Sequence, residues 1–205
     1  MTVVADTVVL EREEAGLDPN EYRFINHWIL RGTLEEVAEI LGNPVDYARW
    51  WPCAWLDYTG IHHGGKAEVG GQFAYRVKGW LPYSLRLRFT VTEDEPPHHF
   101  AVDCAGDLVG HGIWTLSPHG DGVEAVYEWR VRADWWLIRW FSRFGKPLFR
   151  SNHFWVMRNG ARSLAIELAR RAATSPEDLA RIPAPPGPTF PEGLRRWLRR
   201  GRAAR

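Results

Sequence analysis

Apolar and polar residues alternate strictly along much of the middle of the chain. In the segment 85–92, for example, Leu85, Leu87 and Phe89 are separated by arginines. A spacing of two places such residues on one face of a β-strand, so the run predicts a strand with one buried face. Comparable runs predict further strands at 72–78, 100–104, 110–116 and 124–132. Turns rich in Gly and Pro separate the runs, which is typical of an antiparallel meander.

The segment that precedes this meander has a different pattern. Residues 22–31 are apolar on both faces, which predicts a strand covered on more than one side. Thr33 and Glu36 then have the spacing of a capping box, so we expect a short helix to begin there. An Asn-Pro pair predicts a second short helix over 44–50.

Beyond the meander the spacing becomes helical. We expect a first helical piece to stop at Gly145 and a long helix to run from Pro147 to about Ala173. One stripe of the long helix consists of residues three or four positions apart, namely Phe149, His153, Met157, Gly160, Leu164 and Leu168. A glycine inside a helix costs about 1 kcal/mol relative to alanine. We therefore expect Gly160 to be required either by a close approach of the sheet or by room for a ligand.

The order of these elements predicts the fold class. A strand, two short helices, six strands and a long helix make an α+β domain of about seven strands. So few strands do not close on themselves, so the curved antiparallel sheet must bury its concave face against the long C-terminal helix. We expect this helix-grip domain to span residues 21–173, between an N-terminal extension (1–20) and a Pro-rich and Arg-rich C-terminal tail (174–205). A cavity is expected between helix and sheet.

Four stretches of the chain are similar to those of a known superfamily. They are Thr33 to Glu36, Arg49-Trp50-Trp51-Pro52, Gly106 to Trp114, and Asn152-His153 with Val156, Met157, Gly160 and Leu164. Together with the order of elements, they resemble the START-like superfamily (SRPBCC or Bet v 1-type) and, within it, the polyketide cyclase/dehydrase and lipid-transport branch. The resemblance covers roughly residues 20–172. It implies the helix-grip fold but carries over no catalytic residue, because this fold serves carriers, cyclases and regulators alike.

The interior of such a fold supplies the candidate ligand-binding residues. They are Tyr75, Phe89, Val102, Trp114, Tyr127, Trp129, His153, Met157, Gly160 and Leu164. Aromatic rings suit an apolar guest, and tyrosine hydroxyls can orient it. His153 is also the candidate acid/base, since imidazole changes its charge near neutral pH. The alternative is a core histidine that hydrogen-bonds a strand carbonyl or Asn26.

The composition and motifs of the chain argue against several kinds of functional site. The two cysteines, Cys53 and Cys104, are too few for a disulfide framework or a zinc site. The histidine pairs at 62–63 and 98–99 lack a supporting ligand set, so we expect no metal and no cofactor. The chain has no Gly-rich phosphate loop, nucleophile elbow or HExxH motif. It also shows neither a signal peptide nor a membrane span, so a cytoplasmic location is expected.

Charge is placed unevenly along the chain. The net charge is +1, yet residues 191–205 carry six arginines and one glutamate. This tail, together with Trp135, Trp136 and Trp140, suits peripheral contact with a membrane. The alternatives are a solvated tail and a tryptophan cap over the sheet edge. No nucleic acid partner is expected.

Three functions remain open. The first is binding, including transport, of a small hydrophobic molecule such as a lipid or an aromatic polyketide in an internal cavity. The second is an enzyme of the cyclase, aromatase or dehydratase type, with His153 as acid/base. The third is an interaction module at membrane surfaces. A homodimer through Trp155 and Ile166 is also expected if nothing else covers that face of the long helix.

Overall fold

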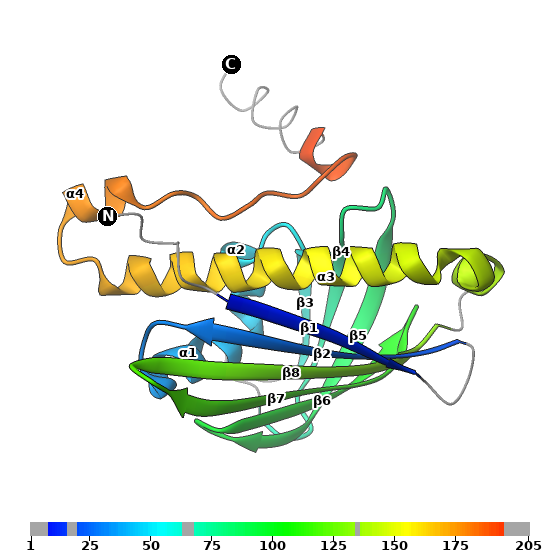
Figure 1. Ribbon diagram of the computed structural model, residues 1–205, viewed down its shortest axis with the longest axis horizontal. Helices are drawn as coiled ribbons and strands as arrows, with labels where there is room; N and C mark the ends of the chain where they lie inside the picture. Colours follow the sequence, from blue (N-terminus) through cyan, green and yellow to red (C-terminus); the bar gives the residue numbers. More distant parts are fainter. Residues whose placement is uncertain (1–7, 16–19, 63–67, 134–135, 195–205) are drawn as a thin grey trace.

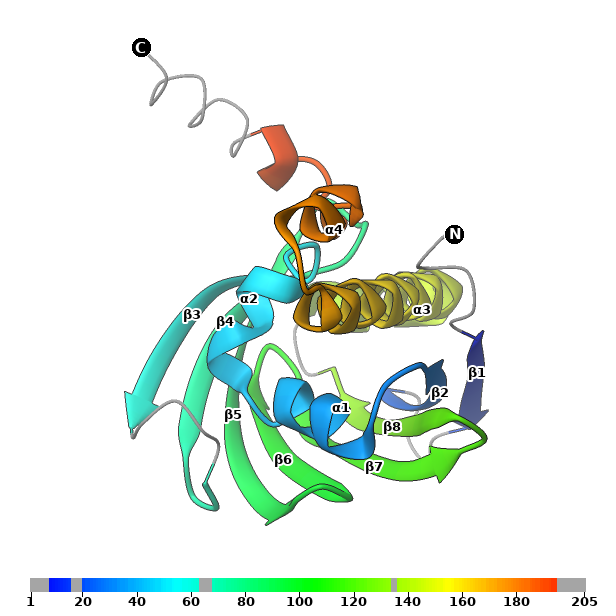
Figure 2. The same cartoon turned by 90° about the vertical axis from the view of Figure 1, so that its left-hand side faces the viewer.

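The computed structural model describes residues 8–15, 20–62, 68–133 and 136–194. The chain forms one curved antiparallel sheet, and a long helix lies across its concave face (Figure 1). Two short helices lie at one end of the sheet (Figure 2). The predicted α+β helix-grip fold is confirmed.

Over the described residues, the sheet contains eight strands in the order β1-β2-β8-β7-β6-β5-β4-β3. Their bounds are β1 (Val8–Ala15), β2 (Glu21–Leu30), β3 (Trp55–His62), β4 (Gln72–Lys78), β5 (Ser84–Glu95), β6 (His99–Gly106), β7 (Val109–His119) and β8 (Gly122–Arg132). The predicted runs at 22–31, 72–78, 85–92, 100–104, 110–116 and 124–132 correspond to β2, β4, β5, β6, β7 and β8. Strand β1 comes from the segment predicted as an N-terminal extension and pairs with β2, so it adds an edge strand to the sheet.

The helical segments of the described residues are α1 (Leu34–Leu41), the 3₁₀-helix η1 (Pro44–Asp46), α2 (Tyr47–Trp50), α3 (Trp136–Ala172) and α4 (Pro176–Arg181). Helix α1 and the 3₁₀-helix η1 begin where the sequence predicts, directly after Thr33 and Asn43. Before α1, the backbone N–H of Glu36 donates to Thr33 Oγ1 at 3.2 Å, and the backbone N–H of Thr33 donates to Glu36 Oε2 at 2.9 Å. These are the two reciprocal bonds of a capping box.

Helix α3 begins earlier than predicted, at Trp136. The expected stop at Gly145 is wrong, because the helix continues through Gly145 and Pro147. A proline within a helix removes one hydrogen bond and bends the axis, but residues on either side can remain helical. Figure 1 shows the first turns of α3 at an angle to the rest.

Aromatic rings fill much of the space between α3 and the sheet. Trp28 on β2 lies 5.6 Å from Trp51, just after α2, and 4.9 Å from Trp114 on β7, measured between ring centroids. Both contacts are edge-on, which is an arrangement that aromatic pairs favour. Cys53 and Cys104 are buried free thiols, and burial raises the pKa of each to about 12.

The segment after α4 returns along the outer side of α3 (Figure 1). It is attached near the end of β4: Thr189 Oγ1 donates to the Gly79 carbonyl at 3.0 Å, and Glu192 lies 2.7 Å from the Arg76 guanidinium. On α3, Ile166 is 1 % exposed and Trp155 is half-buried. These two residues therefore do not form the exposed patch on which the expected homodimer depended.

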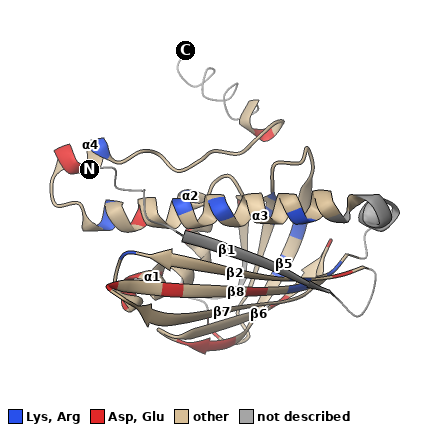
Figure 3. Cartoon of the chain, viewed as in Figure 1, with Lys and Arg blue, Asp and Glu red and all other residues tan. Residues whose placement is uncertain are grey.

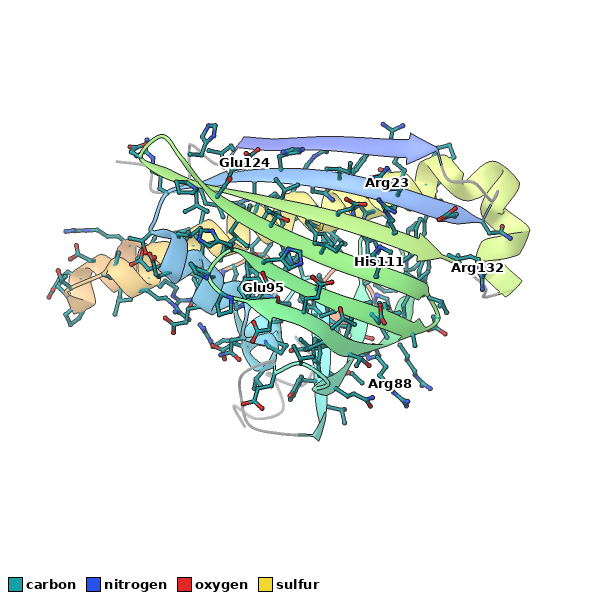
Figure 4. All side chains as sticks on the ribbon, turned by 90° about the horizontal axis from the view of Figure 1, so that it is seen from below. Arg23, Arg88, Glu95, His111, Glu124 and Arg132 are labelled. Atoms are coloured by element: carbon teal, nitrogen blue, oxygen red, sulfur yellow. The ribbon has the colours of Figure 1, made fainter. Side chains whose placement is uncertain are left out.

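Charged and polar side chains project from the convex face of the sheet. Arg23, Arg132 and His111 project from β2, β8 and β7 in the view from below (Figure 4), and the outward placement of His111 agrees with the alternation along β7. Arg23 lies 3.0 Å from Glu128 on the neighbouring strand. Basic residues also recur along α3 (Figure 3). The apolar interior therefore lies between α3 and the concave face.

Candidate functional site

A cavity of about 170 Å³ lies between α3 and the concave face of the sheet. Its walls come from β4 to β8, from α3 and from the segment of η1 and α2. Seven of the ten predicted ligand-binding residues line it, namely Phe89, Val102, Trp114, Tyr127, Trp129, His153 and Met157. Tyr75, Gly160 and Leu164 do not line the cavity.

Tyr75 and Leu164 are part of the solid core. Tyr75 on β4 is 2 % exposed, and its hydroxyl donates to the carbonyl of Pro44, so it ties β4 to η1. Burial raises the pKa of Tyr75 above its ordinary value, so the phenol stays protonated. Leu164 on α3 is fully buried. Both side chains are packed against protein and are not available to a ligand.

Gly160 on α3 leaves room for a protein side chain. A Cβ atom at this position would overlap the indole ring of Trp51. The ring follows α2 in the chain and also lines the cavity. Of the two expected reasons for Gly160, neither applies: the close approach is made by Trp51, not by the sheet or a ligand. Gly160 thus shapes the cavity indirectly, by letting Trp51 lie against the helix.

His153 projects from α3 toward β2. Its ring stacks on Phe24 with 4.1 Å between centroids and an interplanar angle of 14°. Its Nε2 lies 3.1 Å from Nδ2 of Asn26, which is fully buried. His153 therefore makes the expected contact with Asn26 and lines the cavity as well.

The surroundings of Asn26 assign the proton on this imidazole. Asn26 Nδ2 also lies 3.5 Å from the carbonyl oxygen of Tyr127, which only accepts hydrogen bonds. The Asn26 atom that lies near both the Tyr127 carbonyl and His153 is therefore the NH₂ nitrogen. His153 Nε2 accepts a hydrogen bond from this nitrogen. The neutral ring then carries its proton on Nδ1.

Burial sets the charge of His153. It lowers the pKa of the imidazole from 6.5 to about 3, so the ring is neutral at physiological pH. No described residue offers a hydrogen-bond partner to Nδ1. With Nε2 engaged by Asn26, the group that His153 can offer to a ligand is the Nδ1–H donor.

Tyr127 on β8 provides a second polar group in the cavity wall. Its ring stacks on Trp114 at 4.5 Å between centroids and on Trp129 at 5.9 Å. Gly112 on β7 makes room for it, because a Cβ there would lie 2.5 Å from the Tyr127 hydroxyl. That hydroxyl has no hydrogen-bond partner among the described residues, and burial raises its pKa well above 10. It is a neutral hydroxyl, able to donate or accept.

Lys78 and Asn152 form a polar end of the cavity that the sequence analysis missed. Lys78, at the end of β4, is 4 % exposed and its Nζ donates to the Leu81 carbonyl at 2.5 Å. Asn152 on α3 is 8 % exposed and accepts the backbone N–H of Leu81 at 3.1 Å. Both side chains line the cavity. Alternation along β4 predicts an outward Lys78, but Lys78 is buried and lines the cavity together with its neighbours Val77 and Gly79.

Acidic side chains line the opposite end. Glu93 and Asp94 lie on β5, whose residue Ser84 pairs with Lys78 on β4. Glu93 follows Ser84 by nine positions, so the two residues lie toward opposite ends of β5. Burial raises the pKa of Asp94, and the charge of Glu68 acts in the same direction. The cavity therefore has a basic end and an acidic end.

No metal site is present among the residues that the structure describes, since they include no close group of three or more His, Cys, Asp and Glu. His98 Nδ1 lies 3.3 Å from the Leu116 carbonyl, and His99 Nε2 lies 2.8 Å from Glu93. His63 lies outside the described residues, as does the side chain of His62.

The membrane-contact hypothesis rests on residues that the structure does not describe. Trp135, the side chains of Trp136 and Trp140, and the arginines of 195–205 all lie outside the described part. Within the described part, no helix has the combination of length and apolar character that crossing a bilayer requires.

Comparison with known proteins places the chain in a family. A family model described as polyketide cyclase / dehydrase and lipid transport matches residues 30–169. No curated protein matches the chain.

Solved structures share the fold at low sequence identity. A START superfamily protein from Mycobacterium smegmatis has a TM-score of 0.58 and 12 % identity, over 73 % of this chain and 98 % of its own. A protein from Thermus thermophilus has a TM-score of 0.56 and 13 % identity, over 76 % and 99 %. Another M. smegmatis protein has a TM-score of 0.52 and 16 % identity, over 82 % and 99 %. Such identities show the fold alone. Because the family model covers more than half of the sequence, the chain belongs to the polyketide cyclase / dehydrase and lipid transport family.

Proposed function

We propose that this protein binds a small hydrophobic molecule in the cavity between α3 and the sheet. The observation that carries the proposal is a largely aromatic cavity whose wall includes a tyrosine hydroxyl without a partner among the described residues. The Tyr127 hydroxyl is not among the fully buried unpaired atoms, so it faces the cavity. A ligand that hydrogen-bonds to the Tyr127 hydroxyl and to the Nδ1–H of His153 would gain about 0.5–1.5 kcal/mol from each bond. The family, whose description includes lipid transport, supports hydrophobic ligand binding in general.

The size of the cavity limits the ligand. An apolar cavity of about 150 Å³ accommodates benzene. The cavity here measures about 170 Å³. It therefore suits a compact molecule of one or two rings, or a short aliphatic chain, more than a phospholipid with two long chains.

Shape alone gives modest affinity. A two-ring ligand that buries about 300 Å² of apolar surface gains about 7 kcal/mol at about 25 cal/mol per Å². Association costs roughly 4–15 kcal/mol in lost freedom, so much of this gain is offset. Polar contacts in the cavity must therefore supply a large share of both affinity and selectivity.

The charge state of His153 favours binding over acid/base catalysis. A general acid/base works best with a pKa near the operating pH. The pKa of His153 is about 3, and its Nε2 already accepts from Asn26. In the proposed function, His153 positions the ligand as a hydrogen-bond donor.

Tryptophan fluorescence provides the test. Trp51, Trp114 and Trp129 line the cavity, so a bound aromatic ligand should quench or shift their emission. We expect Val102→Trp, which places a large ring in the cavity wall, to weaken binding by at least about ten-fold. Val126→Trp is the matched control, because Val126 points to the opposite face of the sheet from Tyr127.

A panel of naphthalene derivatives, monocyclic aromatics and medium-chain lipids covers the expected size range. Saturable binding that Val102→Trp abolishes and Val126→Trp preserves would support the proposal. Absence of binding across the panel, or equal binding by the two variants, would overturn it.

A further inference from the structure

We propose that Lys78 and Asn152 form an anion subsite at one end of the cavity, so that the natural ligand is an apolar molecule bearing a carboxylate. This inference rests on the proposed function of the cavity and names the chemical class of its ligand. It is carried by a buried ammonium group that faces the cavity with most of its hydrogen-bonding capacity unused among the described residues.

Lys78 is the first observation. Lysine is almost never this buried unless its charge is paired. Lys78 is 4 % exposed, yet no carboxylate of the described residues lies within ion-pair distance of its Nζ. An ammonium group has three N–H donors, and the Leu81 carbonyl accepts one of them. Two donors therefore have no protein acceptor among the described residues.

Asn152 is the second observation. Its Oδ1 accepts the N–H of Leu81, which leaves the Nδ2 group without a hydrogen-bond partner among the described residues. Gly79 permits this position, because a Cβ at Gly79 would collide with the Asn152 amide. Lys78 and Asn152 hold the carbonyl and the N–H of the same residue, Leu81, and both side chains line the cavity. Their unused donors therefore belong to the same end of the cavity, where a carboxylate offers two acceptor oxygens.

The surrounding charges favour an anion over a neutral carbonyl. The charge of nearby Arg76 is already balanced, since Arg76 lies 2.7 Å from both Asp57 and Glu192. Burial lowers the pKa of Lys78, while Glu192 acts in the opposite direction. A ligand carboxylate would stabilise the buried ammonium directly, whereas a neutral carbonyl would leave its charge uncompensated.

The charges at the two ends of the cavity favour one orientation of such a ligand. Lys78 offers an ammonium group without a carboxylate partner among the described residues, whereas Glu93 and Asp94 offer no cation to an anion. The ligand carboxylate therefore lies at Lys78, and the apolar body extends toward Phe89 and Trp129.

A matched pair of probes tests the subsite on the full chain. The anion 2-naphthoate and the neutral ketone 2-acetonaphthone have similar shape, and only the first carries a carboxylate. We expect the wild type to bind 2-naphthoate at least about ten-fold more tightly, which is the usual scale of a charge-assisted hydrogen bond. Calorimetric titration at two salt concentrations measures both affinities.

Two variants separate the subsite from the rest of the cavity. Lys78→Met keeps the length of the side chain and removes its charge, so 2-naphthoate should lose at least about ten-fold while 2-acetonaphthone changes by less than about three-fold. Asn152→Asp keeps the acceptor for the Leu81 N–H but replaces the free donor with an anion, so it should weaken 2-naphthoate in the same selective way. Arg88→Met is the control, because it removes one positive charge from an exposed position on the convex face (Figure 4).

The outcomes distinguish this inference from the proposed function. If neither probe binds the wild type, both proposals fail. If both probes bind equally, or if Lys78→Met and Asn152→Asp leave the preference unchanged, the cavity stands and the anion subsite is overturned. Should Lys78→Met fail to fold, the preference of the wild type and of Asn152→Asp still decides the question.

Discussion

The two halves of the α3 stripe meet different surroundings, although they belong to one continuous helix. His153 and Met157 line the cavity, whereas Gly160 and Leu164, within the next two turns, do not. The difference comes from Trp51, whose ring occupies the space beside Gly160. The length of the hollow part is therefore set by a residue that belongs neither to the helix nor to the sheet.

Two tyrosines illustrate the difference between packed and cavity-lining positions. Tyr75 does not line the cavity, and its hydroxyl donates to the Pro44 carbonyl. Tyr127 lines the cavity, and its hydroxyl has no partner among the described residues. The filled half also contains unpaired polar groups, since the Trp51 Nε1–H and the Ser163 hydroxyl are buried without a partner among the described residues. Polar groups in the cavity wall differ from these because a ligand or water can complete their hydrogen bonds.

The largest expected loss of stability comes from removing the side chain that fills the space beside Gly160. Trp51→Ala removes the ring that packs on Gly160 and Trp28, so we expect a loss of about 3–5 kcal/mol in the free energy of unfolding. Urea denaturation measures this loss. Trp80→Ala is the control, since Trp80 is 38 % exposed and should change stability little. Equal losses for the two variants would contradict the packing role of Trp51.

Substitution of Gly160 tests the same contact between α3 and the Trp51 ring. Gly160→Ala should destabilise the wild type, because its Cβ would overlap the Trp51 ring. In the Trp51→Ala background the same change should stabilise by about 1 kcal/mol, since alanine then improves helix propensity without a clash. The wild type, the two single variants and the double variant form a double-mutant cycle, in which urea denaturation measures the free energy of unfolding of each protein.

A smaller effect concerns His153 in the hollow half. The unfolded chain binds a proton on this imidazole near pH 6.5, whereas the folded protein does so near pH 3. Between these values the unfolded state binds more protons, so the free energy of unfolding falls as the pH falls through this window and is fully retained above it. From pH 7 to pH 5 we expect a loss of about 2 kcal/mol.

His153→Phe should flatten that pH dependence, as measured by urea denaturation at both pH values. The exposed His119 provides the control, because His119→Phe should leave the slope between pH 7 and pH 5 unchanged. A wild-type slope that survives in His153→Phe would show that another group is responsible.

The smallest effects distinguish the two tyrosines. Tyr75→Phe should cost about 1 kcal/mol, because it removes a buried hydrogen bond and leaves the Pro44 carbonyl without its donor. Tyr127→Phe should change stability by less than about 0.5 kcal/mol, since its hydroxyl has no partner among the described residues. Thermal denaturation of the two variants measures both values. An equal loss at both positions would remove the distinction between the filled and hollow halves.

Local patterns in the sequence were sufficient for most of the fold. The alternation over 85–92 predicts β5, and the Thr33–Glu36 spacing predicts the start of α1. These signals are local, because strand faces repeat every two residues and a cap joins residues three apart. Strand β1 and the start of α3 at Trp136 were not predicted. Strand β1 was missed because an edge strand is held by backbone hydrogen bonds to one neighbour, and these depend little on side-chain pattern. The start of α3 was missed because a proline can lie inside a bent helix as well as at the beginning of one.

The candidate site was predicted in part. Alternation and helical spacing identified Phe89, Trp129 and His153 correctly as residues that face the interior, and all three line the cavity. The same rules assigned Lys78 to the outer face, whereas the structure buries Lys78 and places it in the cavity wall. They also gave no sign that Trp51 would lie against Gly160, more than a hundred residues along the chain.

The sequence by itself determined which faces of the strands and of α3 point inward, since that depends on residue spacing within each element. Only the tertiary structure decided where the interior is filled, where it is hollow and which polar groups face the hollow part. The physical reason is that a cavity is the small volume left between large packed surfaces. Its size and lining depend on contacts between residues far apart in the chain, such as Trp51 with Gly160 and Lys78 with Leu81 beside Asn152.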